Sequence, residues 1–296
     1  MTDRRRWLVL LLLPPLFWAG NALVGRAVVD EVSPVTLSFW RWVAALALIL
    51  PFTGRGLAAH LPVLMAHWRV VVPLGLFSVA AYNTLLYLAL QTTTAINATL
   101  VGTSLPLMVL VLARLWLDEP IRGRQAAGIA VSALGLVAVV AKGDAALLAR
   151  LDFAPGDLLM LLATLSWSIY SVMLRKHPLP VPGFTLLAAL IAVGVAAITP
   201  LYLWEAARGA SLPSTPAALG AVAYTAVFAS LAAYYFWNRG VAAVGAAVAG
   251  QFTYLIPLFT AVLAVALLGE EFRWFHAAGG ALIFAGIALA TSGRGS

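Results

Sequence analysis

Residues 95–139, AINATLVGTSLPLMVLVLARLWLDEPIRGRQAAGIAVSALGLVAV, align without a gap with residues 246–290, AAVAGQFTYLIPLFTAVLAVALLGEEFRWFHAAGGALIFAGIALA, and 15 of the 45 positions are identical. Matches of Ala, Leu and Val carry little information in so apolar a chain. The informative matches involve prolines, charges and glycines: Pro106 with Pro257, Glu119 with Glu270, Arg122 with Arg273, Gly128 with Gly279 and Gly135 with Gly286. The chain is therefore a tandem duplication, and the functional meaning of the duplication depends on the number of membrane spans in each copy.

The composition of the chain is that of a membrane protein. Of its 296 residues, 63% are hydrophobic and 10% are charged, whereas a soluble domain carries about 25% charged residues to cover its surface. A spanning helix takes about 20 apolar residues, so the length allows about ten spans with short loops. The sequence predicts an all-α protein of ten transmembrane helices.

Residue types that bind metals or carry covalent chemistry are scarce. The chain has no cysteine, and its four histidines stand singly outside the apolar runs, whereas a metal site needs three or four converging ligands. A phosphate-binding loop motif is absent from the sequence. We therefore expect that the protein binds no metal or cofactor and is not an enzyme. The net charge of +7 would suggest nucleic acid in a soluble protein, but here it reflects membrane topology.

Hydropathy places the spans between short loops. The first apolar stretch follows Arg4-Arg5-Arg6 and has the features of a signal peptide, but it is long and its Trp18 has a counterpart, Trp167, in the second copy. We interpret it as a helix of the mature protein. The predicted spans lie near 7–27, 34–54, 70–90, 95–117, 125–141, 155–175, 183–204, 216–237, 242–268 and 275–291.

Basic residues are distributed unequally between the loops. On the side of both termini the loops hold 12 Arg and Lys residues, and on the other side they hold 5. The positive-inside rule places both termini in the cytoplasm. The two copies, 1–145 and 146–296, then have five spans each, and an odd number turns the second copy upside down. Inverted repeats are typical of transporters, because two similar halves in opposite orientation support inward-open and outward-open conformations.

Several motifs stand in a characteristic order. The second span contains Phe39-Trp40-Arg41. In each copy the fourth span ends near an acidic residue, at Glu119 or at Gly269-Glu270, and a glycine-containing fifth span follows. The chain resembles, over essentially its whole length, the EamA-type members of the drug/metabolite transporter superfamily. Phe17-Trp18-Ala19-Gly20-Asn21 and Tyr82-Asn83 are most similar to bacterial aromatic amino acid exporters. The resemblance implies an inner-membrane carrier that exports amino acids through a central cavity between the halves.

Aromatic and polar residues deep in the spans are candidates for substrate binding. Trp18 and Asn21 are three residues apart, on one face of the first helix, and Trp167 and Tyr170 have the same relation in the sixth span. Stacking surfaces with a few hydrogen-bonding groups suit amphipathic solutes. Packing of these aromatics against neighbouring helices would give the same pattern.

Three further spans contribute candidates. The third span has Tyr82 and Asn83. The ninth has Gln251 and Tyr254, whose counterparts are Leu100 and Thr103, and a polar interhelical contact is their alternative role. The eighth span has Tyr234, Tyr235 and Trp237, which cannot all face one cavity.

Two pairs of residues are candidates for conformational roles. Pro106 and Pro257 occupy equivalent mid-span positions, where a proline kinks a helix; they suit hinges, and a fixed kink is the alternative. Arg41 lies within the second span and is either a carboxylate-binding or gating cation or, as we favour, a structural residue that snorkels or forms a salt bridge near Glu270 or Glu271.

The sequence predicts a carrier of amino acids, aromatic and other neutral ones, as a monomer or weak homodimer in the lipid bilayer. No Asp or Glu lies near the centre of a span, whereas ion-coupled carriers usually need an intramembrane acid. We therefore expect facilitated diffusion by alternating access. The alternatives are an exporter of cationic drugs or other small metabolites and, more distantly, an intramembrane lipid-modifying enzyme, which would need clustered acids or histidines.

Overall fold

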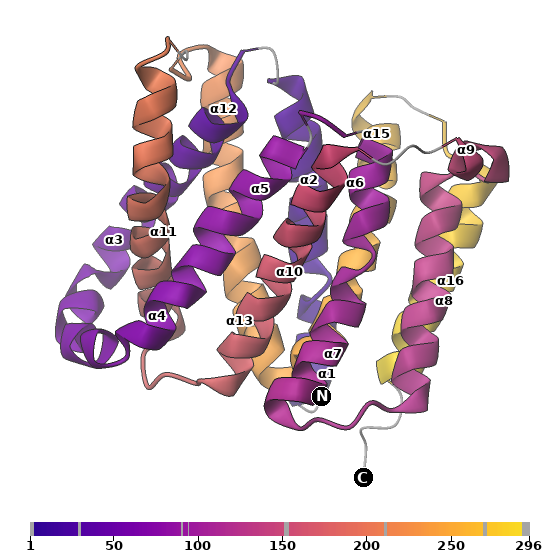
Figure 1. Ribbon diagram of the computed structural model, residues 1–296, viewed down its shortest axis with the longest axis horizontal. Coiled ribbons are helices and arrows are strands. Elements are labelled where there is room, and N and C mark those ends of the chain that lie inside the picture. Colours follow the sequence, from indigo (N-terminus) through magenta and orange to yellow (C-terminus); the bar gives the residue numbers. More distant parts are fainter. Residues whose placement is uncertain are drawn as a thin grey trace.

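The computed structural model describes residues 3–28, 31–89, 91–93, 95–150, 154–209, 212–268 and 271–291. These residues form a bundle of helices joined by loops (Figure 1). Ten helices in the described residues are long and apolar enough to cross a membrane. The prediction of an all-α, ten-span protein is confirmed.

Interruptions divide three of the five spans in the first half. The break in span one lies just before Pro14 and Pro15, which have no N–H to donate to the helical hydrogen bonds. Span one consists of α1 (Asp3–Leu10) and α2 (Leu13–Ala27), span two of α3 (Pro34–Ala66), span three of α4 (Trp68–Gly75), a π-helical segment η1 (Leu76–Ala81) and α5 (Tyr82–Ala89), span four of α6 (Ala95–Gly102) and α7 (Leu105–Leu117), and span five of α8 (Gly123–Val140).

The second half repeats the interruptions of the third and fourth spans but not that of the first, and it follows a short helix, α9 (Ala145–Ala149), at whose start the predicted boundary between the copies falls. A π-helical segment again interrupts the third span of the half, and a break again interrupts the fourth. Span six is α10 (Pro155–Lys176), span seven α11 (Gly183–Ala206), span eight α12 (Pro216–Tyr224), η2 (Thr225–Ala232) and α13 (Ala233–Val244), span nine α14 (Ala246–Gln251), the 3₁₀ turn η3 (Phe252–Tyr254) and α15 (Leu255–Leu268), and span ten α16 (Trp274–Thr291).

Both mid-span prolines lie just after a break. Pro106 is the second residue of α7, and Pro257 is the third residue of α15. Each proline lacks the N–H that would bond to the carbonyl four residues earlier, so the α-helical ladder is weakest at Gly102 and Thr253. The predicted interruptions are present, and their role as hinges stays a prediction.

The contacts between the halves are those of two inverted repeats. On a two-fold axis a residue contacts its own counterpart. The Ser132 hydroxyl donates to the carbonyl of Ile283 at 3.2 Å, and the Tyr254 hydroxyl donates to the carbonyl of Thr103 at 3.0 Å. Both pairs have the offset of the sequence repeat. The halves are therefore related by an approximate two-fold axis in the plane of the membrane.

Helices α8 and α16 cross closely at glycines, at the right-hand end of the bundle (Figure 1). Gly128 lies against Gly286, and Gly135 lies against Gly279. Because Gly128 corresponds to Gly279 and Gly135 to Gly286, each glycine faces the counterpart of the other. This exchange requires antiparallel helices, as the inverted topology predicts.

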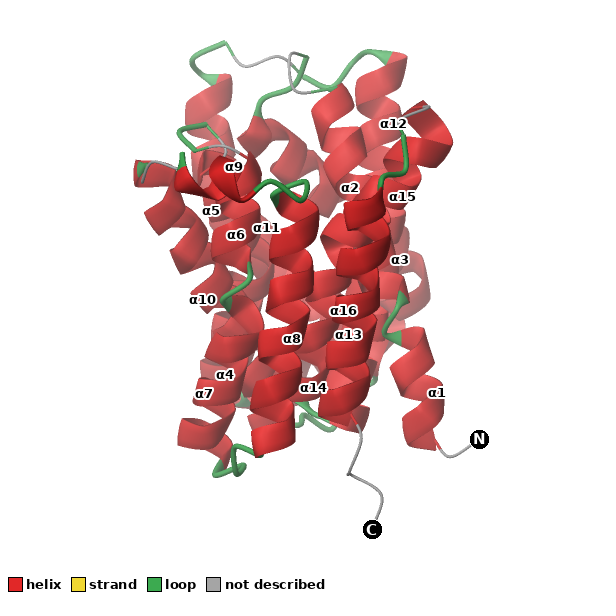
Figure 2. Cartoon of the chain, turned by 90° about the vertical axis from the view of Figure 1, so that its right-hand side faces the viewer, coloured by secondary structure: helices red, strands yellow, loops and turns green. Residues whose placement is uncertain are grey.

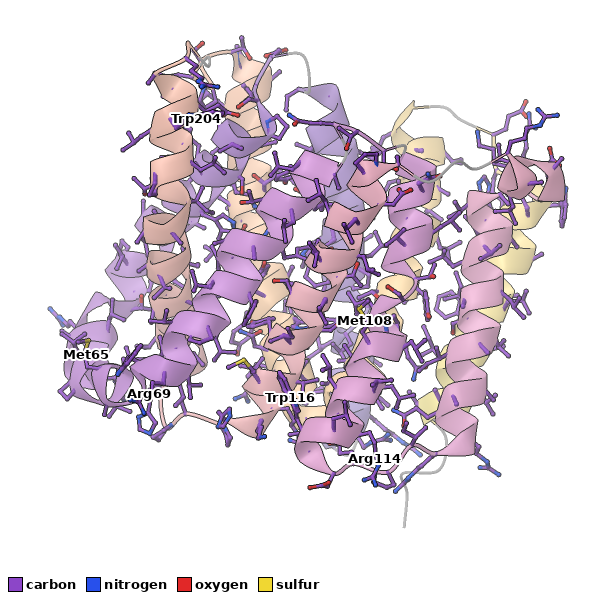
Figure 3. The ribbon with its side chains drawn as sticks, in the orientation of Figure 1. Met65, Arg69, Met108, Arg114, Trp116 and Trp204 are labelled. Carbon is purple, nitrogen blue, oxygen red and sulfur yellow. The ribbon has the colours of Figure 1, made fainter. Side chains whose placement is uncertain are left out.

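The beginning of the first helix and the end of the last helix lie on the same side of the bundle. Nη2 of Arg4 in α1 donates to the carbonyl of Thr291 at the end of α16, at 3.3 Å, and the views agree (Figures 1 and 2). Arg69 and Arg114 lie at this end too, and Trp204 lies at the opposite end (Figure 3). The arrangement fits an even number of spans with the basic loops on the side of the termini.

The second span departs from its predicted end at residue 54. Helix α3 continues to Ala66 and has 33 residues, about 50 Å at 1.5 Å per residue, whereas the hydrocarbon core is about 30 Å thick. Residues 55–66 contain enough Leu, Ala, Val and Met to continue the helix, although Arg55 and His60 interrupt their apolar character. The last three turns of α3 thus extend beyond the predicted span, toward the face that holds Arg69 (Figure 3).

Candidate functional site

Aromatic side chains from both halves meet in the middle of the bundle. Edge-to-face and tilted contacts with ring centroids 5.0–6.4 Å apart connect them, the arrangement that aromatic pairs prefer. They are contributed by spans one, two, three, six and eight. We call Trp18, Trp42, Tyr82, Trp167, Tyr170, Tyr234 and Trp237 the central aromatic cluster.

The two predicted tryptophans contact each other directly. The rings of Trp18 in α2 and Trp167 in α10 are perpendicular, with centroids 5.2 Å apart. These residues are counterparts in the two copies, so the cluster lies at the approximate two-fold axis. Around Trp167 lie Tyr82, at 5.0 Å, and Tyr170, at 5.2 Å. Four of the predicted substrate-binding residues are thus brought together.

Span eight divides its three aromatic side chains between two faces. Tyr234 and Trp237, three residues apart, contact Trp167 at 5.1 and 5.5 Å, whereas Tyr235 stacks on Phe184 at 4.3 Å. A helix turns by about 100° per residue, so positions 234 and 237 share a face that excludes 235. The expectation that not all three face one cavity is confirmed.

The cluster has a closed interior and an accessible edge. Trp42, Tyr170 and Trp237 are fully buried, whereas Trp18 and Tyr82 are partly exposed. Asn21, one turn from Trp18 on α2, is also partly exposed, but its Oδ1 is buried. Trp18, Asn21 and Tyr82 thus form the accessible edge of the site.

A buried arginine lies beside this cluster. Arg41 of α3 is 1% exposed and donates hydrogen bonds to four neutral oxygens. Nε donates to Ser230 Oγ at 3.0 Å, Nη1 to Asn83 Oδ1 at 3.4 Å and to the Tyr87 hydroxyl at 3.2 Å, and Nη2 to the carbonyl of Ala229 at 3.2 Å. These contacts hold the guanidinium between spans two, three and eight.

The described residues give Arg41 partners other than the predicted carboxylates. No carboxylate in the described residues pairs with Arg41, and the Glu271 carboxylate instead contacts Arg273 at the exposed end of the bundle, at 3.3 Å. Glu270 lies outside the described residues. The side chain of Arg41 does not snorkel either, because burial by three spans keeps it from the membrane surface. Among the described residues, the hydrogen-bond partners of Arg41 are all neutral.

The two π-helical segments supply equivalent carbonyl groups to these side chains. The carbonyl of Ser78 in η1 accepts from the Tyr234 hydroxyl at 2.8 Å, and that of Ala229 in η2 accepts from Trp18 Nε1 at 3.1 Å and from Arg41. Ser78 and Ala229 are counterparts at the offset of the repeat. Single π-helical turns occur often at functional sites, and here they direct backbone acceptors toward the cluster from both halves.

The remaining predicted residues divide between this network and the helix breaks. The Asn83 amide is buried and contacts Arg41 and the Tyr234 hydroxyl, at 3.4 Å each. Gln251 is fully buried at the end of α14, and Tyr254 bonds to Thr103 across the axis. Asn83 therefore positions Arg41, and Gln251 and Tyr254 lie where the breaks of spans four and nine meet.

Several members of the site were not predicted. Trp42 packs on Tyr234 at 5.0 Å, and the Arg41 guanidinium lies 5.0 Å from its ring centroid. Tyr87 and Ser230 bind Arg41. Trp42 directly follows Arg41 within an apolar span, which is the only sequence signal for it. Tyr87 could have been found from its position one turn after Asn83, on the same face of α5.

Comparisons with known proteins agree with this architecture. The model of the EamA-like transporter family matches the chain twice, at residues 5–141 and 154–292. An uncharacterized transporter of Archaeoglobus fulgidus is 31% identical over 291 residues, which are 96% of each chain. The uncharacterized inner membrane transporter YedA of Escherichia coli is 27% identical over 289 residues, 94% of this chain and 88% of YedA.

A solved crystal structure has the same fold, with a TM-score of 0.80 and 23% sequence identity over 97% of each chain. The double match of the family model coincides with the two five-span halves, whose axis passes through the central aromatic cluster. The chain is a multi-pass membrane transporter, not an enzyme, and it belongs to the EamA-like transporter family.

Proposed function

We propose that this transporter exports amino acids, aromatic and other neutral ones, from the cytoplasm across the bacterial inner membrane. The observation that carries the proposal is the central aromatic cluster, because both halves build it at their common axis and because Trp18, Asn21 and Tyr82 form its accessible edge. Aromatic faces beside a few polar groups suit a small solute with an apolar side chain and a polar end. The inner-membrane location is supported by the similarity to YedA.

Alternating access is supported by the pairs of counterparts at the axis. Trp18 contacts Trp167, and Tyr254 bonds to Thr103, at the level of the cluster and of the helix breaks. Each half can tilt about these contacts when the breaks before Pro106 and Pro257 bend. Because the halves are alike and inverted, the inward-open and outward-open states have similar free energies.

Facilitated diffusion is supported by the positions of the acidic side chains among the described residues. Asp157, the buried one, lies at the start of α10, where its carboxylate accepts from the backbone N–H of Ala154 at 2.8 Å, from Asn97 Nδ2 at 3.2 Å and from the Thr93 hydroxyl. These bonds cap a helix and hold the carboxylate away from the cluster. An acid that carries protons or cations through a membrane usually lies in the pathway.

Cationic drugs are the second candidate class, and the buried charge of Arg41 opposes it. A cation near the cluster would be repelled by a guanidinium that has no carboxylate partner in the described residues. Large substrates with several phosphates would need more basic residues at the cluster than Arg41. The site favours small solutes with little or no net charge.

Uptake into proteoliposomes tests the proposal. Purified protein would be reconstituted and given a panel of radiolabelled amino acids, with a pH indicator inside the vesicles. We expect saturable uptake of aromatic and other neutral amino acids without accompanying proton flux. Uptake that depends strictly on a pH gradient would refute facilitated diffusion, and no uptake of any amino acid would refute the substrate class.

Variants then locate the pathway. Trp18→Ala, Tyr82→Ala and Trp167→Ala should each abolish most of the uptake, because each removes a ring of the cluster. Trp204→Ala is the matched control, since Trp204 is 53% exposed at one end of the bundle. Wild-type rates in all three cluster variants, with normal membrane insertion, would exclude the cluster as the site.

A further inference from the structure

The charge at Arg41 is buried without compensation in the described residues. Four neutral oxygens accept its hydrogen bonds, and a guanidinium keeps its proton in proteins. Hydrogen bonds satisfy its donors but leave a full positive charge in a low-dielectric interior, where isolated charges are costly unless they are paired. A buried arginine of this kind is poised to bind an anion.

Three buried indole groups of the central aromatic cluster also lack hydrogen-bond partners in the described residues. In the described residues, Nε1 of Trp42, Trp167 and Trp237 has no hydrogen-bond partner, although each atom is buried. Buried indole N–H groups usually find an acceptor. Trp18 shows the usual case, because its Nε1 donates to the carbonyl of Ala229. An indole only donates, so the cluster has an excess of donors that acceptor atoms of a solute would satisfy.

The charge and the donors belong to one continuous site. Arg41 and Trp18 donate to the same oxygen, the carbonyl of Ala229, at 3.2 and 3.1 Å. The Arg41 guanidinium lies over Trp42, whose ring contacts Tyr234, and Tyr234 contacts Trp167. Trp167 in turn contacts Trp18 and Tyr82, so the guanidinium is linked through direct contacts to the rings of the accessible edge.

We propose that Arg41 and the indole N–H groups bind the carboxylate of the transported solute. A carboxylate carries one negative charge and accepts through two oxygens, which matches one cation and several unpaired donors. One turn from Trp18, Asn21 Oδ1 is a buried acceptor with no hydrogen-bond partner among the described residues, and it suits an ammonium group. The inference rests on the proposed function and narrows the solute to zwitterions or monoanions with an apolar side chain.

The asymmetry of the charge gives the solute an orientation. At the offset of the repeat, Arg41 corresponds to Ala192 in the second half. The aromatic parts of the site are contributed by both halves, whereas the cation comes from the first half. The carboxylate end of a bound solute is therefore directed toward Arg41, and its apolar end toward the rings of Trp18 and Tyr82 at the accessible edge.

Three related probes test the proposal as competitors of labelled phenylalanine uptake in proteoliposomes. Phenylalanine has both charged groups, 3-phenylpropionate has only the carboxylate, and phenethylamine has only the ammonium group. We expect the first two to compete at least tenfold more strongly than the amine. Arg41→Gln should weaken phenylalanine and 3-phenylpropionate at least tenfold and leave the amine unchanged or stronger. Arg69→Gln, at the end of the bundle, is the matched control.

Trp167→Phe and Trp237→Phe keep a ring and remove an N–H, so they test the donors even if Arg41→Gln fails to fold. They should weaken the two carboxylates and not the amine. Equal competition by all three probes in the wild type would overturn the inference and leave the proposed function standing, and so would unchanged competition in the variants.

No uptake of any amino acid would overturn the proposed function, and thermal unfolding in detergent then tests the inference separately. Stabilisation of the wild type by 3-phenylpropionate, absent in Trp167→Phe, would support a carboxylate site. No stabilisation of the wild type would overturn it.

Discussion

The close crossing of α8 and α16 makes a sharp stability prediction for Gly135→Ala. A Cβ at Gly135 would lie 2.6 Å from the carbonyl oxygen of Gly279 and 2.8 Å from Cβ of Leu282. Carbon atoms normally stay about 3.3–4.0 Å from such neighbours. The oxygen belongs to the backbone of a helix, so the whole of α16 must move away by about 0.7–1 Å.

The magnitude follows from two opposing effects. Overpacking of a tight interface costs about 1–3 kcal/mol, and alanine is favoured over glycine in a helix by about 0.5–1 kcal/mol. Gly123→Ala isolates the second effect, because Gly123 is in the same helix and no atom lies within 4 Å of its added Cβ. The two variants should therefore differ by about 1–3 kcal/mol in stability.

Thermal unfolding in detergent, followed by the fluorescence of the ten tryptophans, measures this difference. We expect Gly135→Ala to unfold roughly 2–12 °C below Gly123→Ala, taking about 2–4 °C per kcal/mol. Gly286→Ala, its counterpart on α16, should be destabilised in the same direction, since its Cβ would lie 2.5 Å from the carbonyl oxygen of Gly128. If Gly135→Ala proves as stable as Gly123→Ala, the close crossing of α8 and α16 at these glycines is incorrect.

Two further predictions concern topology and movement. The chain has no cysteine, so Arg122→Cys and Arg273→Cys introduce single labels at equivalent positions of the two copies, and a membrane-impermeant maleimide should reach them from opposite sides of the membrane; labelling of both in intact cells would contradict the inversion. Tyr254→Phe removes the hydrogen bond to Thr103. Because interhelical hydrogen bonds in membranes contribute about 0.6–1.7 kcal/mol, the uptake rate should change about three- to twentyfold if this bond breaks during transport. An unchanged uptake rate would show that the contact is kept in both conformations.

Much of the architecture could be predicted because it depends on properties that each segment carries locally. Hydropathy defines ten spans, and the counterparts Trp18 and Trp167 mark the middle of the bundle. Pro106 and Pro257 interrupt their helices through the missing N–H wherever the helices pack. An odd number of spans per copy makes inversion a matter of counting, and it needs no knowledge of side-chain contacts.

The site was predicted less completely, because its contacts depend on how each helix is rotated and how deeply it packs. Tyr234 and Tyr235 are neighbours of the same type, and the rotation of α13 sends them to different partners. Trp42 has no counterpart or motif that distinguishes it from a lipid-facing aromatic. The π-helical segments have no simple sequence signature, yet they place the carbonyls of Ser78 and Ala229 in the site.

The duplication, the spans, their inversion and the central position of Trp18, Tyr82 and Trp167 could be inferred without knowing how the helices pack. The neutral partners of Arg41 in the described residues, in place of a carboxylate, became apparent from the packed bundle. The physical reason is distance along the chain: Arg41 is held by Ser230 and Ala229, almost 190 residues away. Hydropathy and charge can be read from each segment alone, whereas the environment of a buried charge forms only when distant segments pack together.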